Sequence, residues 1–333
     1  MNPSTGVLTI DLAAIQENWR RVNEQLHGHS KAAAVIKANA YGLGANQVGP
    51  ALFAAGCREF FVATLEEAIA ARSYLPQTAI VYVLGGVRSG AEGLFIQHAL
   101  IPTLFTLDDV ERWQSFCAEQ NVRGTCVLKI DTGMTRLGLD AAAFISLCQK
   151  SGGFDHLNVA LVMSHLACAD ELDHPLNIQQ LREFQRVVGE ARKVLPGARF
   201  SLANSSGIFL GRQWHFDLVR PGASLYGINP RPETISPVIP VIRLQLPILQ
   251  LRKIEQSVAL GYGARVQLEP PAQVLVAAGG YADGLHRTIG CNGLGEVAGR
   301  LLPVIGRISM DTTLFDATLL EPDALTANAM IEV

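Results

Sequence analysis

The chain lacks any apolar run near the ~20 residues that a membrane-spanning helix needs, and it lacks an excess of positive charge. Lysine and arginine together number 27, against 30 aspartates and glutamates, which gives a formal net charge of −3. Without a basic surplus the chain has little to neutralise a phosphate backbone, which argues against a nucleic-acid binder. The first residues show no charged segment followed by an apolar one, so no secretory signal is predicted. The expected partners therefore include neither a membrane nor a nucleic acid.

Cysteine is scarce and its spacing points to no site. The six cysteines form no CxxC pair, and none lies near a histidine at zinc-ligand spacing, so the sequence predicts no metal site. Thiols without such patterns are typical of reduced, buried side chains in the cytoplasm. We therefore expect a cytoplasmic protein.

Charged and aromatic residues are also few. Charged residues make up 17% of the 333 residues and aromatic residues 7%, whereas 49% are apolar. The charged fraction lies below the ~25% of typical globular chains, which indicates a large buried core and argues against a disordered chain. At this length we expect more than one domain.

Short β-branched runs alternate with longer helical patterns between residues 31 and 227. Strands that alternate with helices indicate βαβ units around a parallel sheet, and continuous apolar runs suit strands buried on both faces. Eight such units favour a (β/α)8 TIM barrel, whose usual size is ~250 residues; a doubly wound open sheet is the alternative. The expected strands cover residues 32–38, 60–64, 79–86, 101–105, 125–131, 159–166, 199–206 and 216–222.

The pattern changes after Pro240. Helical periodicity fades, and apolar runs are separated by glycine, proline and aspartate, which is typical of an all-β domain. We expect the barrel over residues 11–235, and a mostly β C-terminal domain formed by residues 1–10 and 236–333, with the proline-rich residues 229–240 as the linker. The final residues, ANAMIEV, are apolar and strand-like where chain ends are usually polar, so this β domain is expected to be incomplete.

Two lysines, Lys37 and Lys129, fall within expected barrel strands. The C-terminal ends of these strands are where barrel enzymes carry their chemistry. An unpaired buried ammonium is costly, so such lysines are usually paired, neutral or covalently used. A lysine in an apolar pocket has a lowered pKa and can form a Schiff base. Pairing with a carboxylate remains the structural alternative for both lysines.

Small and polar residues follow the last expected barrel strands. Ser205 lies at the end of the seventh strand, and Gly222 and Ala223 lie at the end of the eighth. Barrels commonly bind phosphate at these two positions, and glycine lets the backbone approach it closely. This arrangement suits a phosphorylated aldehyde cofactor, although a tight turn would also explain the glycine. His165, at the end of the sixth strand, could stack on an aromatic ring or be a hydrogen-bonded core histidine.

Several segments resemble the motifs of the alanine racemases, a family of barrel-type pyridoxal-phosphate enzymes. KAAAVIKANAYGLG at residues 31–44 is similar to the family's cofactor-lysine motif, and its core is shared more loosely with other barrel-type pyridoxal enzymes. The more specific segments GYADGLHR and GRISMD occupy residues 280–287 and 306–311. The series is completed in order by KIDTGMTRLG (129–138), SHLACAD (164–170), NSSG (204–207), VRPGASLYG (219–227) and LGYGARV (260–266).

The resemblance implies a racemase that interconverts L-alanine and D-alanine with pyridoxal 5′-phosphate and supplies D-alanine for peptidoglycan. Lys37 would hold the cofactor covalently and act as one catalytic base, and Tyr262 would be the other. Moving the Cα proton from one face to the other requires a base on each face. Tyr262 would reach the cofactor of the other subunit, so the resemblance implies a homodimer with shared active sites. Without its motif, Tyr262 would be interpreted as an aromatic of the β-domain core.

The resemblance also implies roles for other residues. Arg220 would face the pyridine nitrogen as a donor, since a guanidinium is effectively never deprotonated. Arg136 would provide the cation that a tyrosine base needs, and a carbamylated Lys129 would orient it. The cofactor-binding residues would be Lys37, Tyr41, His165, Asn204, Ser205, Arg220, Gly222 and Ala223. Arg136 and Met310 would bind the substrate, with Lys129, Tyr281 and Asp311 in support.

The sequence departs from the family pattern in two places. It stops several tens of residues before the usual family endpoint, and position 223, often isoleucine, is alanine. A racemase with broader or serine preference and a barrel-type decarboxylase are the enzyme alternatives. A non-catalytic pyridoxal-phosphate carrier is the alternative of another class, but such carriers are single barrels without a β domain like the one that contains Tyr262.

Overall fold

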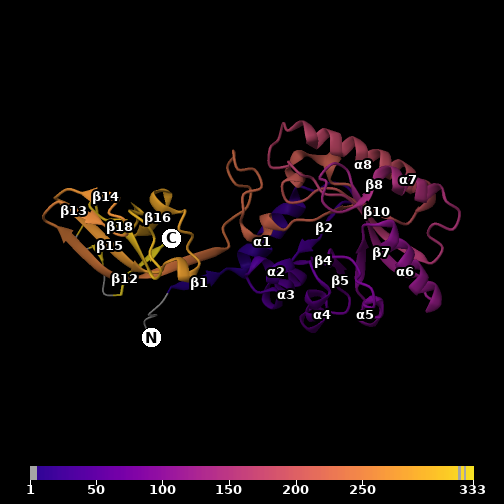
Figure 1. The fold of residues 1–333 in the computed structure, drawn as a ribbon, viewed down its shortest axis with the longest axis horizontal. Helices are drawn as coiled ribbons and strands as arrows, with labels where there is room; N and C mark the ends of the chain where they lie inside the picture. The colour runs from indigo at the N-terminus through magenta and orange to yellow at the C-terminus, as the bar shows by residue number, and fades with distance from the viewer. Residues whose placement is uncertain (1–5, 322–323, 326–327) are drawn as a thin grey trace. The chain divides into compact units, whose positions relative to one another are not determined.

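The computed structural model describes residues 6–321, 324–325 and 328–333 (Figure 1). The chain divides into two compact units, Asp11–Val241 and a second unit made of Met1–Ile10 with Ile242–Val333. The first unit contains the α-helices and the parallel strands, and the second contains antiparallel strands. Residues 1–5, which the sequence assigned to the β domain, lie outside the described residues.

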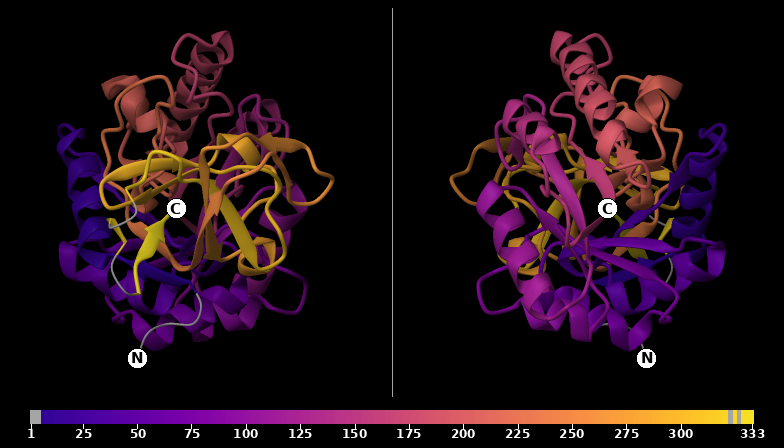
Figure 2. Two further views of the ribbon diagram at one scale, coloured as in Figure 1. Left: turned by 90° about the vertical axis from the view of Figure 1, so that its left-hand side faces the viewer. Right: turned by 90° about the vertical axis from the view of Figure 1, so that its right-hand side faces the viewer.

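The first unit is built on parallel strands, which Figure 2 shows from two sides. They are β2 (Lys31–Ala32), β3 (Ala34–Val35), β4 (Glu59–Val62), β5 (Ile80–Val83), β6 (Ile101–Leu104), β7 (Gly124–Asp131), β9 (Leu157–Met163), β10 (Arg199–Ser201) and β11 (Leu218–Val219). Strands β10, β9, β7, β6, β5, β4 and β3 are neighbours in that order, and β11 pairs with β2. Strands β2 and β3 are halves of one strand, interrupted at Ala33.

Backbone hydrogen bonds complete the circle between β10 and β11. They run from Asp217 N to Phe200 O (2.9 Å) and from Arg220 N to Ala203 O (3.0 Å). An open sheet would leave these two segments as unpaired edges. The (β/α)8 barrel predicted from the sequence is therefore confirmed, and the doubly wound alternative is wrong.

Some expected strands end earlier in the structure than the sequence indicated. The first, expected to reach residue 38, ends at Val35, and the seventh, expected to reach residue 206, ends at Ser201. The eighth is reduced from residues 216–222 to Leu218–Val219. Beyond these ends, Ser205 and Gly222 lie in turns, and Lys37 begins the short element α2 that follows β3.

Apolar side chains fill the barrel. Val35, Phe61, Tyr82, Leu161 and Met163 belong to one buried cluster, and the rings of Phe61 and Tyr82 stack with their centroids 4.5 Å apart. Every residue of β4 is buried, as expected of a parallel strand that helices cover on its outer face. These helices are α1 (Leu12–Glu24), α3 (Ala45–Ala55), α4 (Leu65–Tyr74), α5 (Glu92–Gln97), α6 (Leu107–Glu119), α7 (Ala141–Gln149) and α8 (Pro175–Val194).

Short elements complete this unit. Helix α2 (Lys37–Tyr41) directly follows β3, and the short strand β8 (Leu139–Asp140) pairs with β7. The 3-10 turns η1 (Gly207–Leu210) and η2 (Arg212–Trp214) replace an α-helix between β10 and β11, and η3 (Ala223–Tyr226) follows β11. None of the helices in the described part of the chain combines the length and the apolar character that a membrane crossing requires.

The second unit is an antiparallel β domain. Its strands are β1 (Val7–Ile10), β12 (Ile242–Ile254), β13 (Val258–Leu260), β14 (Val266–Leu268), β15 (Ala272–Ala278), β16 (Leu294–Val297), β17 (Arg300–Pro303), β18 (Thr312–Asp316) and β19 (Met330–Glu332). The main sheet has the order β17-β16-β19-β12-β15-β18, with β1 also paired to β12. Leu246, Leu275, Phe315 and Ile331 lie in its core. The second domain is mostly β, as the sequence predicted.

Candidate active site

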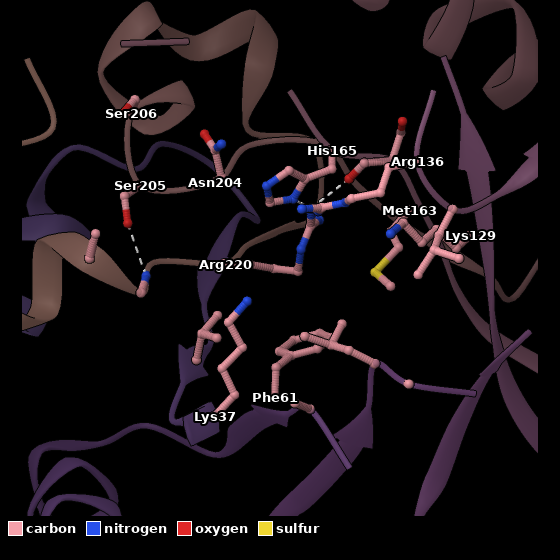
Figure 3. Close-up of a pocket in the computed structure, with 18 of the residues that line it drawn as sticks. Lys37, Phe61, Lys129, Arg136, Met163, His165, Asn204, Ser205, Ser206 and Arg220 are labelled. Atoms are coloured by element: carbon pink, nitrogen blue, oxygen red, sulfur yellow. Dashed lines mark hydrogen bonds between the residues drawn. The ribbon is translucent and has the colours of Figure 1, made fainter. Parts of the chain in front are cut away.

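A cavity of about 500 Å³ lies at the carboxyl edge of the barrel strands (Figure 3). Its lining comes from turns and strands that are distant in the sequence. All the site residues that the sequence placed in the barrel line it: Lys37, Tyr41, Lys129, Arg136, His165, Asn204, Ser205, Arg220, Gly222 and Ala223. Among the described residues that line it, none is an aspartate or a glutamate. The cavity therefore has a cationic interior that suits an anionic ligand.

Lys37 is followed by an unusual backbone turn. Residues 38–41 have φ between 52° and 56°, the left-handed region, although none of them is glycine. Such a conformation costs roughly 1–2 kcal/mol for each L-residue, or about 4–8 kcal/mol for four. Strain of this kind is typical of functional sites and persists only where the surroundings hold it. The turn carries both Lys37 and Tyr41 into the cavity lining.

Side chains and backbone groups hold this turn in place. Ala38 N donates to Glu67 Oε1 (2.7 Å), and Ala45 N donates to Asn39 Oδ1 (2.9 Å). The amide of Gly44 donates to the carbonyl of Asn39 (2.9 Å). These bonds stabilise the left-handed conformation from both ends of the turn.

Tyr41 meets the turn that follows β11. Its ring packs against Tyr226 with centroids 4.6 Å apart. A Cβ atom built on Gly222 would lie only 2.4 Å from the Tyr41 hydroxyl, so this close approach requires glycine. Burial raises the pKa of Tyr41, which keeps its phenol protonated and able to donate a hydrogen bond.

Ser205 joins the same corner of the cavity. Its Oγ accepts hydrogen bonds from Gly222 N (2.9 Å) and Ser224 N (3.2 Å). The phenol of Tyr41, the Ser205 hydroxyl and the backbone of Gly222 and Ala223 therefore converge at one part of the cavity lining. Hydroxyl and amide donors beside a glycine that admits close approach are the donor set that a phosphate group needs.

The side-chain amide of Asn204 is hydrogen-bonded to the backbone of neighbouring loops. Its Nδ2 donates to Leu166 O (3.2 Å), and its Oδ1 accepts from Gly207 N (2.9 Å). The side chain thereby ties the turn after β10 to the loop after β9. It keeps Ser205 in place from behind.

Arg220 is a buried cation with neutral partners. Its Nη2 donates to the carbonyls of Ser164 (2.5 Å) and Leu202 (3.4 Å), and its Nη1 donates to Ser201 Oγ. Only 5% of the residue is exposed. Burial lowers the pKa of its guanidinium to about 10, which still leaves the group charged at neutral pH. It can therefore only donate to a ligand atom.

His165 lies beside Arg220 (Figure 3). Burial, followed by the positive charges of Arg220, Arg136 and Lys129, lowers its pKa to about 3. The imidazole is therefore neutral at physiological pH. Because Arg220 Nη2 donates to Nδ1 at 3.4 Å, the ring proton is assigned to Nε2. A neutral, flat ring at this position suits stacking against an aromatic ligand.

Lys129 and Arg136 come from β7 and the loop after it. Burial, and then the charges of Arg136 and Arg220, lower the pKa of Lys129 to about 8. At pH 7 about a tenth of the amine is therefore neutral. Asp131 shapes the loop that leads to Arg136, because its Oδ1 accepts from three successive backbone amides beginning at Gly133 (2.9–3.1 Å).

The remaining predicted site residues belong to the β unit. Tyr262 lies on the turn between β13 and β14 and is 68% exposed, so it does not fill the core of its own domain. Tyr281, Met310 and Asp311 lie in two adjoining loops. The Tyr281 amide donates to Ser309 O (3.0 Å), and the next amide, of residue 282, donates to Met310 O (2.9 Å). The GYADGLHR and GRISMD segments therefore form one structural feature.

Sequence reasoning missed residues that position the site from behind. Ser201, whose Oγ accepts from Arg220, is a fully buried polar residue within a strand-like run. Tyr226 lies inside the VRPGASLYG motif, but its packing on Tyr41 has no sequence signal. Glu67 has only the spacing of a helix N-terminus, three residues after Thr64.

Two family models match successive parts of this chain. The model described as "Alanine racemase, N-terminal domain" matches residues 10–230, and "Alanine racemase, C-terminal domain" matches residues 241–332. The chain belongs to the alanine racemase family. The family predicted from the sequence motifs is thereby confirmed.

Curated relatives and solved structures agree with this membership. An alanine racemase of Rhodospirillum rubrum is 43% identical over 99% of this chain and 87% of its own length. A catabolic alanine racemase of Mesorhizobium japonicum is 42% identical over 98% of this chain and 84% of its own length. The structure of alanine racemase from Bartonella henselae with covalently bound pyridoxal phosphate has a TM-score of 0.90 and 36% identity, covering 99% of this chain and 90% of that one.

Proposed function

We propose that this protein is a pyridoxal-phosphate-dependent alanine racemase that interconverts L-alanine and D-alanine and so supplies D-alanine for peptidoglycan. The observation that carries the proposal is the cavity itself. It joins two lysines, two arginines and a phosphate-type donor set, and no carboxylate lies among the described lining residues. A phosphorylated cofactor and an amino-acid carboxylate are both anions that such a cavity would bind.

The barrel residues fit pyridoxal phosphate. Tyr41, Ser205 and the backbone of Gly222 and Ala223 would hold the phosphate, beside the point where the Tyr41 hydroxyl approaches Gly222. Arg220 would donate to the pyridine nitrogen, and His165 would pack by the ring. Lys37 would carry the cofactor through its Nζ. The bound cofactor supplies the electron-withdrawing ring that makes the substrate Cα–H acidic.

Two bases would handle the Cα proton, one on each face. Lys37 is the base that the barrel supplies. Tyr262 is the second, and its exposure on the β13–β14 turn leaves its hydroxyl available to another molecule. We expect it to act on the cavity of a second copy, in a homodimer with two-fold symmetry. A phenol with an ordinary pKa of ~10 needs a cation beside it, and Arg136 would provide that charge.

The substrate carboxylate would be bound by Arg136 and by the backbone amide of Met310, with Tyr281 and Asp311 lining the entrance. Lys129, whose pKa is lowered to about 8, would react as a neutral amine with carbon dioxide. In that reaction the N–C bond forms and the nitrogen loses a proton, which yields a carbamate. The product is an anion beside Arg136 in place of a repelling cation. A cytoplasmic location is part of the same proposal.

The experiment is a rate measurement with both alanine enantiomers, together with reductive trapping by borohydride. A racemase converts each enantiomer into the other, and borohydride should fix the pyridoxyl group on the peptide that contains Lys37. Comparable rates with serine would indicate the broader-specificity racemase, and cofactor binding without turnover would indicate the carrier. Trapping at Lys129, with Lys37 unlabelled, would contradict the site assignment.

A further inference from the structure

Glu67 lies three residues after the N-cap of helix α4, and from the sequence alone this position indicates only the start of that helix. The helix begins at Leu65 with Thr64 as its N-cap, and Thr64 Oγ1 accepts from Glu67 N (3.2 Å). In an ordinary capping box the acid three residues after the cap turns back to the cap's own amide. The Glu67 carboxylate does not do so. Its Oε2 accepts from Ala63 N (2.7 Å), and its Oε1 accepts from Ala38 N (2.7 Å).

The second of these bonds reaches the peptide that follows Lys37. The amide of Ala38 belongs to the peptide group that joins it to Lys37, and it opens the left-handed turn of residues 38–41. The bond crosses from α4 to α2, between segments 29 residues apart in the sequence. Glu67 is not itself among the cavity-lining residues. We propose that Glu67 is a positioning residue, which holds the strained turn so that the Lys37 amine is aimed into the cavity.

Helix α6 offers a comparison within the same chain, because it also has an acidic residue three positions after its N-cap. Helix α6 has Thr106 as N-cap and Asp109 three residues later, which form a true capping box. Asp109 Oδ2 accepts from Thr106 N (3.1 Å) and Phe105 N (3.4 Å), both at the start of its own helix. The two carboxylates therefore share the helix-capping position, and only that of Glu67 also holds the turn after Lys37.

The proposal rests on the proposed function, because it takes Lys37 as the cofactor lysine. When Lys37 condenses with the cofactor aldehyde, the new N–C bond forms and the carbonyl oxygen leaves as water. The rate depends on how well the amine is placed against an aldehyde that the phosphate contacts hold still. Glu67→Gln retains the shape of the side chain but removes its charge, so the bond from Ala38 N is weakened whichever way the amide faces, and it is lost where the NH2 group faces Ala38 N. The Thr64 cap to residue 67 is left intact.

The test mixes apoenzyme with pyridoxal phosphate and follows imine formation by absorbance, in wild type, Glu67→Gln and the control Asp109→Asn. We expect Glu67→Gln to form the imine about 10-fold more slowly than wild type. This is the lower end of the effect of losing a hydrogen bond to a charged group, and we choose it because the bond from Ala38 N to Glu67 is exposed to solvent. The Asp109→Asn variant should form it at the wild-type rate. Hydrogen exchange of the apoenzyme gives a second readout, in which the Ala38 amide should lose protection only in Glu67→Gln.

The outcomes distinguish a failure of the proposed function from a failure of the proposal about Glu67. If wild type is not trapped on Lys37 by borohydride, the proposed function fails. If wild type is trapped there and Glu67→Gln forms the imine at the wild-type rate, Glu67 serves only the start of its own helix and the proposal is wrong. A fall in melting temperature shared by both variants, without a change in rate, refutes the proposal in the same way. If Glu67→Gln does not fold, Glu67→Asp, which is too short to reach both amides, should show the slower imine formation, and a wild-type rate there refutes the proposal.

Discussion

Gly222 allows a direct test of the proposed phosphate site, which is formed by Tyr41, Ser205 and the backbone of Gly222. A methyl group added at this residue would clash with a known neighbour. A Cβ at this position would lie 2.4 Å from the Tyr41 hydroxyl and 3.3 Å from Val35 Cβ. Non-bonded heavy atoms rest about 3.5 Å apart, so in Gly222→Ala the phenol must retreat by about 1 Å. The Tyr226 ring and the left-handed turn both restrain that movement.

The expected cost follows from the contact that is lost. One hydrogen bond to a charged group contributes about 1.5–3 kcal/mol, so its loss should increase the dissociation constant ~10- to 150-fold. The assay titrates apoenzyme with pyridoxal phosphate and, separately, with pyridoxal, which lacks the phosphate. Affinity for pyridoxal phosphate should fall within this range, whereas affinity for pyridoxal should change little.

The chain supplies a matched glycine for the control. Gly189 lies in α8 with nothing within 4 Å of an added Cβ. Gly189→Ala should leave both affinities unchanged and raise stability slightly, by about 0.5–1 kcal/mol, because alanine is the better helix former. Unchanged affinity for pyridoxal phosphate in Gly222→Ala would refute the placement of the phosphate. An equal loss for both ligands would show that the cavity as a whole had collapsed.

Three further predictions test other parts of the site. Tyr262→Phe should still exchange the Cα proton of one alanine enantiomer in deuterated water while barely racemising it, since one base remains; unimpaired racemisation of both enantiomers would contradict the two-base assignment. Arg220→Glu should favour protonation of the pyridine nitrogen, so the visible spectrum should change and transamination should increase as racemisation slows; an unchanged spectrum and product ratio would count against this contact. The pKa of His165 is lowered from 6.5 to about 3 in the folded protein, so between these pH values the unfolded state binds more protons than the folded state. The free energy of unfolding should therefore fall as pH drops below ~6.5, by at most ~1.4 kcal/mol per pH unit. His165→Asn should flatten that slope in denaturant titrations from pH 7 to 4, and an identical slope would show that His165 does not contribute.

The fold could be predicted from the sequence because its signals are local and repeated. Continuous apolar runs at regular intervals indicate parallel strands buried on both faces, and this pattern does not depend on exact boundaries. The boundaries themselves were less accurate, and the reason is visible at Lys37. Residues 32–38 contain only apolar residues apart from Lys37, which predicts one strand, but the ladder ends at Val35 because the chain enters the left-handed turn. Pattern alone does not reveal that change of conformation.

The cavity shows a similar difference between the residues that line it and the residues that hold those in place. Lys37 and Arg220 could be found because a charge in an apolar strand or beside a glycine turn is conspicuous, and because each lies in a motif. Glu67 could not, because an acid three residues after threonine predicts a helix start wherever it occurs, as it does at Asp109. Only the tertiary structure shows that one of these two carboxylates bonds an amide 29 residues away. Side chains whose role depends on a long-range backbone contact are therefore the part of this active site for which the structure was required.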